Sequence, residues 1–338
     1  MSESKAFISG CKGHLLTTEE RSFFAGERPW GFILFGRNIG EREQICDLVA
    51  ALRDSIGNSR APVLIDQEGG RVQRIRPPLA PQYPSGLAIG DIYRRDNALG
   101  LRAAWLMGRL HAFDLTRFGI NVDCLPVLDV PVPGSHDVIG NRAYGHDPAT
   151  VTAIGQAIGE GLKAGGVLPV MKHMPGHGRT LVDSHHSLPV VNASLDELKA
   201  SDFLPFVAMK DEAMAMSAHM VFTAIDPENP ATTSPKVVRE IIRDHIGFDG
   251  LLMSDDVSMN ALAGDMSARA GGIIGAGLDL VLHCHGIMEE MKAVANAVPV
   301  LAGDRLRRAN AAEAAFREPD GADEEALRAE FDAMFALA

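Results

Sequence analysis

Eight short apolar runs, each bounded by turn-forming residues, constrain the fold of this chain more than any other feature of the sequence. Short runs that are apolar throughout are typical of strands buried on both faces. They are AFIS (6–9), GFILF (31–35), PVLID (62–66), INVDCLP (120–126), VLPVMK (167–172), AMAMSAH (213–219), LLMSD (251–255) and LDLVLH (278–283). We therefore expect eight strands.

Helix-like stretches, in which apolar residues recur every three or four positions, lie between these runs. The clearest cover residues 41–56, 96–119, 147–166 and 234–247. In the last of these, Ser234 is expected to cap the helix and Pro235 to occupy its first turn. Strands that alternate with helices pair in parallel, with the helices as crossover connections.

This alternation predicts an α/β protein with a single (β/α)₈ barrel of the TIM type. The 338 residues suit such a barrel, which takes about 250 residues or more. An open doubly wound sheet is the alternative, because closure of a sheet is not visible in a sequence. Residues 1–338 contain no internal repeat or linker, so we expect one domain, with one or two C-terminal helices at about 304–338 on the outside of the barrel.

Charge and composition exclude several classes of partner. The formal net charge is −12 and no run of Lys or Arg occurs, so we expect neither a nucleic-acid nor a membrane partner. No secretory signal and no apolar run of about 18 residues is found, which favours a cytoplasmic protein. The four cysteines lie far apart and are expected to be free thiols: Cys11, Cys46, Cys124 and Cys284.

Polar side chains follow the ends of six of the expected strands, where the reactive groups of such a barrel lie. They are Asp66, Gln67, Glu68, Arg71 and Arg74 after the third strand, Arg142 in the loop after the fourth, Lys172 and His173 after the fifth, Ser217 and His219 after the sixth, Asp255 and Asp256 after the seventh, and His283 and His285 after the eighth. Each one alone has an ordinary structural explanation. Together they predict a polar site at the C-terminal face of the barrel.

A metal site is one explanation for the histidine-rich segment KHMPGHGRTLVDSHH, residues 172–186. His173 and His177 are four residues apart, but a proline and a glycine between them exclude the helical pair that zinc proteases use. His283 and His285 could supply two ligands and Asp255 a third, as in a metal-dependent barrel hydrolase. This remains an alternative, although one of the two strand-eight histidines is expected to be structural.

An acid–base device fits the same segment better. Asp183 stands two residues before His185, close enough to fix its tautomer and raise its pKa, so that His185 can give and recover a proton near neutral pH. Asp255, at the end of a rigid strand, would stay ionised. Such a pair suits the cleavage of an acetal by double displacement through a covalent intermediate.

Three segments, IDQEGGRVQR, KHMPGHGRTLVDSHHSLP and GFDGLLMSDDVSM, resemble the signature segments of glycoside hydrolase family 3. The similarity extends in order from Phe32 to Val281. It is closest to the single-domain bacterial β-N-acetylglucosaminidases of peptidoglycan recycling. The resemblance implies a retaining enzyme that needs no metal. We also expect no cofactor and a monomer, although the sequence does not give the oligomeric state. The implied reaction removes non-reducing terminal N-acetylglucosamine from 1,6-anhydro-N-acetylmuramic acid, with or without its peptide.

The resemblance also implies roles for individual residues. The nucleophile would be Asp255, the acid/base His185, and the residue that orients it Asp183. The residues expected to bind the hydroxyls of the sugar are Asp66, Arg74, Arg142, Lys172 and His173. The glycines at 176 and 178 would let the loop carry His185 into the site after the substrate binds.

Two departures from the family pattern and two rival functions complete the expectation. Met174 replaces the commoner Phe, and His186 directly follows His185, although the spacing after Asp183 favours His185 as the acid/base. A phosphorylase is the first rival, because a histidine acid/base carries no negative charge to repel phosphate. A non-catalytic sugar-binding barrel is the second, and the presence of both Asp255 and His185 speaks against it.

Overall fold

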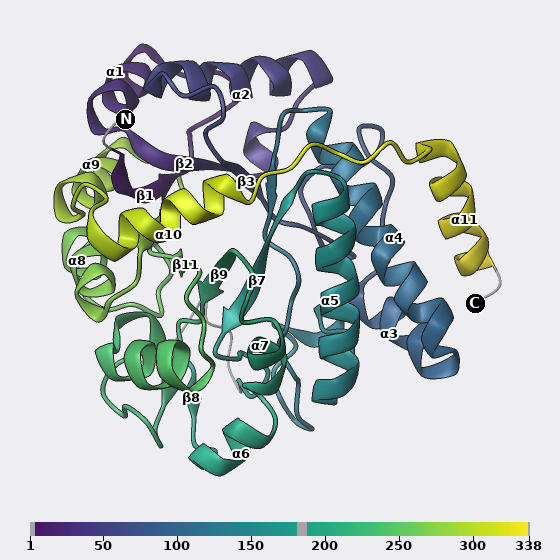
Figure 1. The fold of residues 1–338 in the computed structure, drawn as a ribbon. Coiled ribbons are helices and arrows are strands. Elements are labelled where there is room, and N and C mark those ends of the chain that lie inside the picture. The colour runs from purple at the N-terminus through teal and green to yellow at the C-terminus, as the bar shows by residue number, and fades with distance from the viewer. Residues whose placement is uncertain (1–3, 181–187, 337–338) are drawn as a thin grey trace.

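The computed structural model describes residues 4–180 and 188–336, and its strands close into a parallel barrel (Figure 1). The eight barrel strands are β1 (Lys5–Ser9), β2 (Pro29–Leu34), β3 (Val63–Ile65), β6 (Val122–Asp123), β7 (Leu168–Met174), β9 (Met214–Ser217), β11 (Leu251–Asp256) and β12 (Leu280–His283). Each coincides with one of the eight predicted runs. Every neighbouring pair is parallel, and β12 pairs with β1, so the (β/α)₈ barrel is confirmed over the open sheet.

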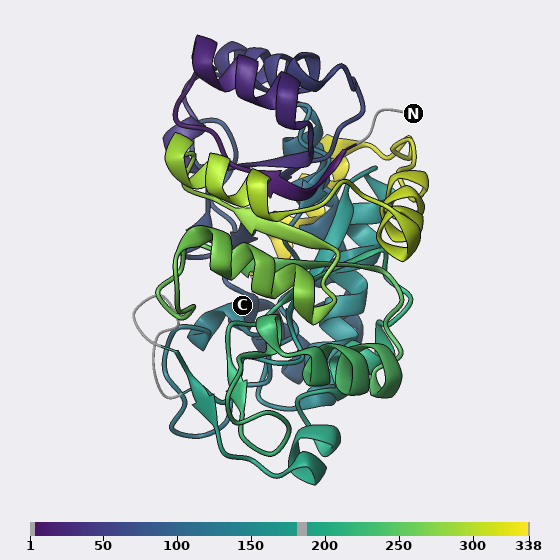
Figure 2. The same cartoon turned by 90° about the vertical axis from the view of Figure 1, so that its left-hand side faces the viewer.

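Helices surround the barrel in the order of the strands. They are α1 (Thr18–Glu27), α2 (Arg42–Ile56), α3 (Gly86–Arg95), α4 (Asn97–Thr116), α5 (Pro148–Ala164), α6 (Leu195–Ala200), α7 (Leu204–Ala208), η4 (Val237–His245), α8 (Met266–Ala276), α9 (Met288–Ala297), α10 (Gly303–Ala314) and α11 (Glu324–Ala336). Figure 2 shows α1, α9 and α8 following one another along the outside of the barrel. All four predicted helices are present, as α2, α4, α5 and η4.

The helix η4 differs from its prediction in one respect. Its start is as expected, because the Ser234 hydroxyl accepts the N–H of Val237 at 3.1 Å. Most of the helix, however, is a π-helix, in which the N–H of Ile246 bonds to the carbonyl of Ile241. Its buried residues are Val237, Val238, Ile241 and Ile242, so the apolar face is the one that the periodicity predicts.

A short antiparallel hairpin follows β3 and carries the first polar residues of the site. It is formed by β4 (Gln67–Gly69) and β5 (Val72–Gln73). Gly69 has a φ of 90°, and a Cβ atom there would lie 2.4 Å from the carbonyl oxygen of Pro84, so only glycine fits. The Gln67 side-chain oxygen accepts the N–H groups of Arg74 and Ile75, both at 3.0 Å. These bonds hold the hairpin shut and fix the residues on either side of its turn.

The C-terminal helices cover two different parts of the barrel. Before α10, the N–H of Leu301 bonds to the carbonyl of Ser4, so α10 lies at the end of the barrel where the strands begin. The other helix, α11, packs against α4 (Figure 1), where Arg328 contacts the buried carboxylate of Asp114 at 2.5 Å. Another short pair of strands, β8 (Val190–Val191) and β10 (Val221–Phe222), lies outside the barrel.

Two further expectations concern the whole chain. All four cysteines are free thiols, and three of them are buried. Within residues 4–180 and 188–336, no helix is both long enough and apolar enough to cross a membrane.

Candidate active site

A pocket opens at the C-terminal ends of the barrel strands, as the strand-end residues predict. The residues that line it include Phe35, Asp66, Glu68, Arg74, Arg142, Lys172, His173, Met216, Asp255, Asp256 and Cys284. These residues come from loops and strand ends that are distant in the sequence, and closure of the barrel brings them together. All five predicted sugar-binding residues and Asp255 therefore lie in one pocket.

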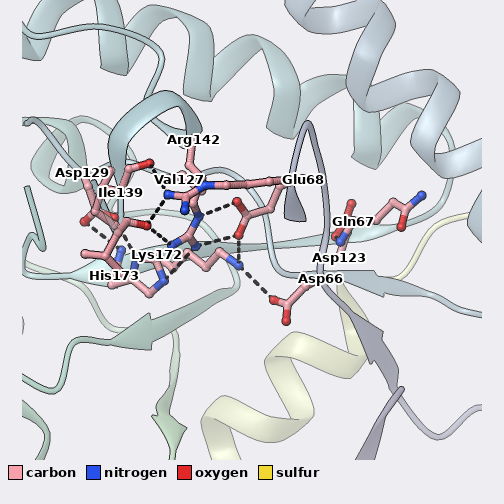
Figure 3. Close-up of polar contacts among 12 residues, drawn as sticks. Asp66, Gln67, Glu68, Asp123, Val127, Asp129, Ile139, Arg142, Lys172 and His173 are labelled. Atoms are coloured by element: carbon pink, nitrogen blue, oxygen red, sulfur yellow. Dashed lines mark hydrogen bonds and ion pairs between the residues drawn. The ribbon is translucent and has the colours of Figure 1, made fainter. Parts of the chain in front are cut away.

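Lys172 is the centre of an ion-pair network on one side of this pocket (Figure 3). Its Nζ atom lies 2.9 Å from Asp66 Oδ1 and 2.6 Å from Glu68 Oε1. Arg142 binds the same Glu68 carboxylate with two nitrogens, Nε and Nη2, each at 2.8 Å. This fork geometry is the strongest arrangement between a guanidinium and a carboxylate. The network thus fixes the side chains that face the pocket before any ligand arrives.

The charges of this network stabilise one another. Burial alone would raise the pKa of Glu68, but Arg142 and Lys172 outweigh it and lower that pKa to about 2. Burial opposes the charge of Asp66 as well, yet Lys172 and Arg74 hold its pKa well below the usual range. Burial would lower the pKa of Lys172, whereas its two carboxylate partners raise it far above the ordinary value. All these groups are therefore ionised at neutral pH.

His173 is held by Asp129, which follows β6. The Asp129 Oδ2 atom lies 2.7 Å from His173 Nδ1, and its Oδ1 accepts the backbone N–H of His177 at 2.7 Å. Burial would raise the pKa of Asp129, but His173 and His177 lower it to about 2, so the carboxylate is ionised. His173 Nδ1 must then carry the proton that it donates to Asp129. The other ring nitrogen, Nε2, lies 3.4 Å from Arg142 and faces the pocket.

Arg74 lies at the mouth of the pocket. Its Nη2 atom binds Asp66 Oδ2 at 2.9 Å, so Asp66 is shared between Arg74 and Lys172. The guanidinium carbon lies 5.1 Å from the ring centre of Phe35, within the range of a cation–π contact. Arg74 therefore links the ion-pair network to an aromatic wall of the pocket.

Asp255 lies on the opposite side, at the end of β11. One of its carboxylate oxygens, Oδ1, accepts the backbone N–H of Asp256 at 2.8 Å. Burial would raise the pKa of Asp255, but the electrostatic influence of His219, His173 and Lys172 and the hydrogen bond from the Asp256 N–H lower it below the usual value. The carboxylate is thus ionised and lines the pocket.

Asp256, the neighbour of Asp255, has a structural role. Its carboxylate accepts the Ser258 hydroxyl at 2.6 Å and the backbone N–H groups of Ser258 and Cys284 at 3.1 and 3.2 Å. Its backbone carbonyl accepts the Nε2–H of His219 at 2.9 Å. The two consecutive aspartates both line the pocket but differ in their bonds: the Asp256 carboxylate accepts bonds from Ser258 and Cys284 at its two oxygens, whereas the bond to Asp255 comes from the backbone of its neighbour.

The histidines at the end of β12 do not form the ligand set considered from the sequence. His283 is fully buried, and its Nε2 lies 2.8 Å from Glu290 on α9, which confirms that one of the pair is structural. His285 is half exposed and lies 3.4 Å from the same carboxylate. Across the described ranges, no group of three or more His, Cys, Asp or Glu side chains is arranged to hold a metal ion.

The structure does not describe the predicted acid/base residues, and it shows two pocket residues whose contacts the sequence does not reveal. Asp183, His185 and His186 fall in residues 181–187, outside the described residues. The sequence places Glu68 at a strand end without indicating a role for it, and the strand-end residues named above do not include Asp129. The position of Asp129 directly after the apolar residues Val127 and Leu128, past the fourth predicted strand, is the signal that points to it.

The comparisons with known proteins agree with this geometry. Residues 17–314 match the sequence profile of the glycosyl hydrolase family 3 N-terminal domain. The beta-hexosaminidase of Bordetella parapertussis is 37% identical over 279 residues, which cover 81% of this chain and 78% of that protein. The beta-hexosaminidase of Stenotrophomonas maltophilia (strain R551-3) is 38% identical over 287 residues, which cover 82% of this chain and 83% of that protein.

Solved structures give the same result over a longer stretch. The crystal structure of NagZ from Neisseria gonorrhoeae in complex with N-trifluoroacetyl-D-glucosamine superposes on this chain with a TM-score of 0.85 at 31% identity. The superposition covers 99% of this chain and 97% of that one.

Proposed function

Since this chain belongs to glycoside hydrolase family 3 and is a β-N-acetylhexosaminidase of that family, we propose that it removes non-reducing terminal N-acetylglucosamine from peptidoglycan fragments. The proposed substrate is N-acetylglucosaminyl-1,6-anhydro-N-acetylmuramic acid, with or without its peptide, and the proposed location is the cytoplasm. The proposed reaction retains the anomeric configuration through a covalent glycosyl-enzyme intermediate.

Asp255 is the proposed nucleophile, and its place in the pocket is the observation that carries the proposal. It is ionised, it sits on a rigid strand end, and within residues 4–180 and 188–336 its carboxylate accepts one hydrogen bond, from the backbone N–H of Asp256. A nucleophile of this kind needs a fixed position and an oxygen that is free to attack the anomeric carbon. Asp66, Glu68 and Asp129 do not meet the second condition, because cations or N–H groups occupy both oxygens of each.

His185 is the proposed acid/base, with Asp183 to orient it. The carboxylates on the other side of the pocket support this choice, because the low pKa values of Asp66 and Glu68 leave them no proton to donate near neutral pH. Neither carboxylate can therefore serve as the protonated acid that glycosidases usually pair with a carboxylate nucleophile. An imidazole titrates in the required range, and the segment that carries His185 follows β7 directly.

The ion-pair network is the proposed binding site for the sugar hydroxyls. Asp66, Arg74, Arg142, Lys172 and His173 are the residues to which we assign it. Charged groups that already pair with one another keep fixed positions, so binding orders few side chains and the hydroxyls meet donors and acceptors in place. We add Glu68 and Asp129 as the partners that hold Arg142, Lys172 and His173.

Product analysis tests the proposed function. The purified protein is incubated with N-acetylglucosaminyl-1,6-anhydro-N-acetylmuramic acid, with and without a peptide stem, and the products are identified by mass spectrometry. We expect free N-acetylglucosamine at the same rate with and without added phosphate. Formation of N-acetylglucosamine 1-phosphate would instead establish the phosphorylase, and release of no sugar would contradict the substrate assignment.

A further inference from the structure

Three buried side chains near the proposed nucleophile form a hydrogen-bonded series, which has no part in the function described so far. Ser217, His219 and Thr232 are all fully buried. The Thr232 hydroxyl oxygen lies 2.8 Å from the Ser217 hydroxyl and 2.9 Å from His219 Nδ1. His219 Nε2 lies 2.9 Å from the backbone carbonyl oxygen of Asp256. The hydrogen-bonded series therefore ends at the backbone carbonyl group of Asp256, the residue that follows Asp255.

The place of this contact in the sheet is informative. Among the described residues, the register between β9 and β11 ends with the pair Met216–Met253, before β11 reaches Asp255. On its other side β11 stays attached to β12, where Asp256 pairs with Leu282 after a shift in register. The bond from His219 thus joins the segment that follows β9 to the last residue of β11, beyond the point where the backbone ladder between the two strands ends. The His219 side chain thus supplies a hydrogen bond between the two segments where no backbone pairing is present in the β9–β11 register.

Elementary chemistry shows which group donates and which accepts in each bond of this hydrogen-bonded series. A carbonyl oxygen can only accept, so His219 Nε2 carries a hydrogen. Burial lowers the pKa of His219, which favours the neutral ring and leaves Nδ1 as an acceptor for the Thr232 hydroxyl. The carbonyl of Ala218 also lies 2.9 Å from that hydroxyl, so its proton is shared between two acceptors. Removal of the hydroxyl would leave His219 Nδ1 buried without its donor.

We propose that His219, supported by Thr232, is a positioning residue that fixes the backbone of Asp256 and thereby the nucleophilic carboxylate of Asp255. The inference rests on the proposed role of Asp255. The N–H of Asp256 binds Asp255 Oδ1, and the carbonyl of the same residue binds His219, so a shift of Asp256 moves the carboxylate. A displacement of about 1 Å can cost a catalytic group about 100-fold in rate.

Matched substitutions test this role without removing a charge from the pocket. Thr232→Val deletes the hydroxyl at nearly constant volume, and Thr232→Ser keeps it. His219→Met removes both polar atoms of the ring, and His219→Gln keeps a donor for Asp256 and an acceptor for Thr232. We expect Thr232→Val and His219→Met to lower kcat on an aryl N-acetylglucosaminide about 10- to 100-fold. Thr232→Ser and His219→Gln are expected to stay within a fewfold of the parent protein.

The affinity for N-acetylglucosamine separates positioning from a general structural role. We expect its Kd, measured by calorimetry, to change less than twofold in Thr232→Val, because the opposite side of the pocket is intact. A kcat within twofold of the parent would overturn the inference, and so would a loss of kcat accompanied by an equal loss of affinity. Asp255→Ala is measured in parallel. If that variant keeps its activity, the proposed nucleophile is wrong, and the failure concerns the proposed function and not the role of His219.

Discussion

The two sides of the pocket are built in opposite ways. On the paired side, each carboxylate is bound through both oxygens; this side consists of Asp66, Glu68, Asp129, Arg142, Lys172 and His173. On the open side, Asp255 has a backbone N–H at one oxygen and is held through its neighbour Asp256. Groups that bind a sugar gain from mutual pairing, because pairing fixes them in place. A nucleophile needs an oxygen that no protein cation occupies.

The largest effect is expected from the open side. Asp255→Ala removes the carboxylate that forms the proposed covalent bond, so kcat/KM on an aryl N-acetylglucosaminide should fall about 10⁴-fold or more. N-Acetylglucosamine should still bind, since the paired side is unchanged. Asp256→Asn is the matched control, and it should lose much less, because an amide can keep part of the bonding to Ser258 and Cys284. Equal losses in the two variants would remove the distinction between these aspartates.

The next effect concerns the proposed acid/base, His185. His185→Ala should lower the rate on the natural disaccharide about 10²- to 10⁴-fold, because the leaving hydroxyl must be protonated. An aryl substrate with a good leaving group should lose far less. Its matched control is His186→Ala, which should leave both rates near those of the parent. If both substrates lost activity equally in His185→Ala, His185 would be a structural residue.

A smaller effect is expected from the centre of the paired side. Lys172→Met removes the cation shared by Asp66 and Glu68, and with it a charge-assisted bond to the sugar, so the affinity for N-acetylglucosamine should fall about 10- to 100-fold. The loss should appear as weaker binding in calorimetry, in contrast to Asp255→Ala. Unchanged affinity in Lys172→Met would contradict the assignment of this side to sugar binding.

The smallest effect is a pH dependence of stability that Glu68 on the paired side should produce. The pKa of Glu68 is lowered from 4.5 to about 2, so in the folded protein this group binds its proton more weakly than in the unfolded chain. Its contribution to stability is complete above about pH 4.5 and is lost as the pH falls toward 2. Glu68→Gln should therefore flatten the decline of the urea midpoint between pH 4.5 and 2.5. An unchanged slope would mean that Glu68 is not held ionised.

The sequence predicts the barrel and several of the residues that share the pocket, for a physical reason. Parallel strands are buried on both faces, so each appears as a continuous apolar run, and all eight were found. In a closed parallel barrel the C-terminal ends of all strands lie on one face. Asp66, Lys172 and Asp255 could therefore be expected to share one pocket, although they are far apart in the sequence.

What the sequence does not show is how these residues pair. Asp129 binds His173, and Glu68 binds both Arg142 and Lys172. These residues follow different strands, so whether they meet depends on the register between the strands and on the closure of the barrel. No local pattern encodes such contacts. The helices α1, α3 and α6 to α9 were not located either; α1, for example, has an acidic first turn and only Glu20 and Phe24 buried, so it carries little apolar periodicity. The roles of Asp183 and His185 remain predictions.

The central claim is that Asp255 is the group that becomes bonded to the sugar, and trapping the intermediate tests it most directly. The protein is treated with an N-acetylglucosaminyl fluoride that carries a second fluorine at C5, which slows the breakdown of a glycosyl-enzyme ester. The protein is then digested and its peptides are sequenced by mass spectrometry. We predict a single added sugar, located on Asp255. A sugar on Asp256 or on any other residue, or consumption of the reagent without any adduct, would contradict this account.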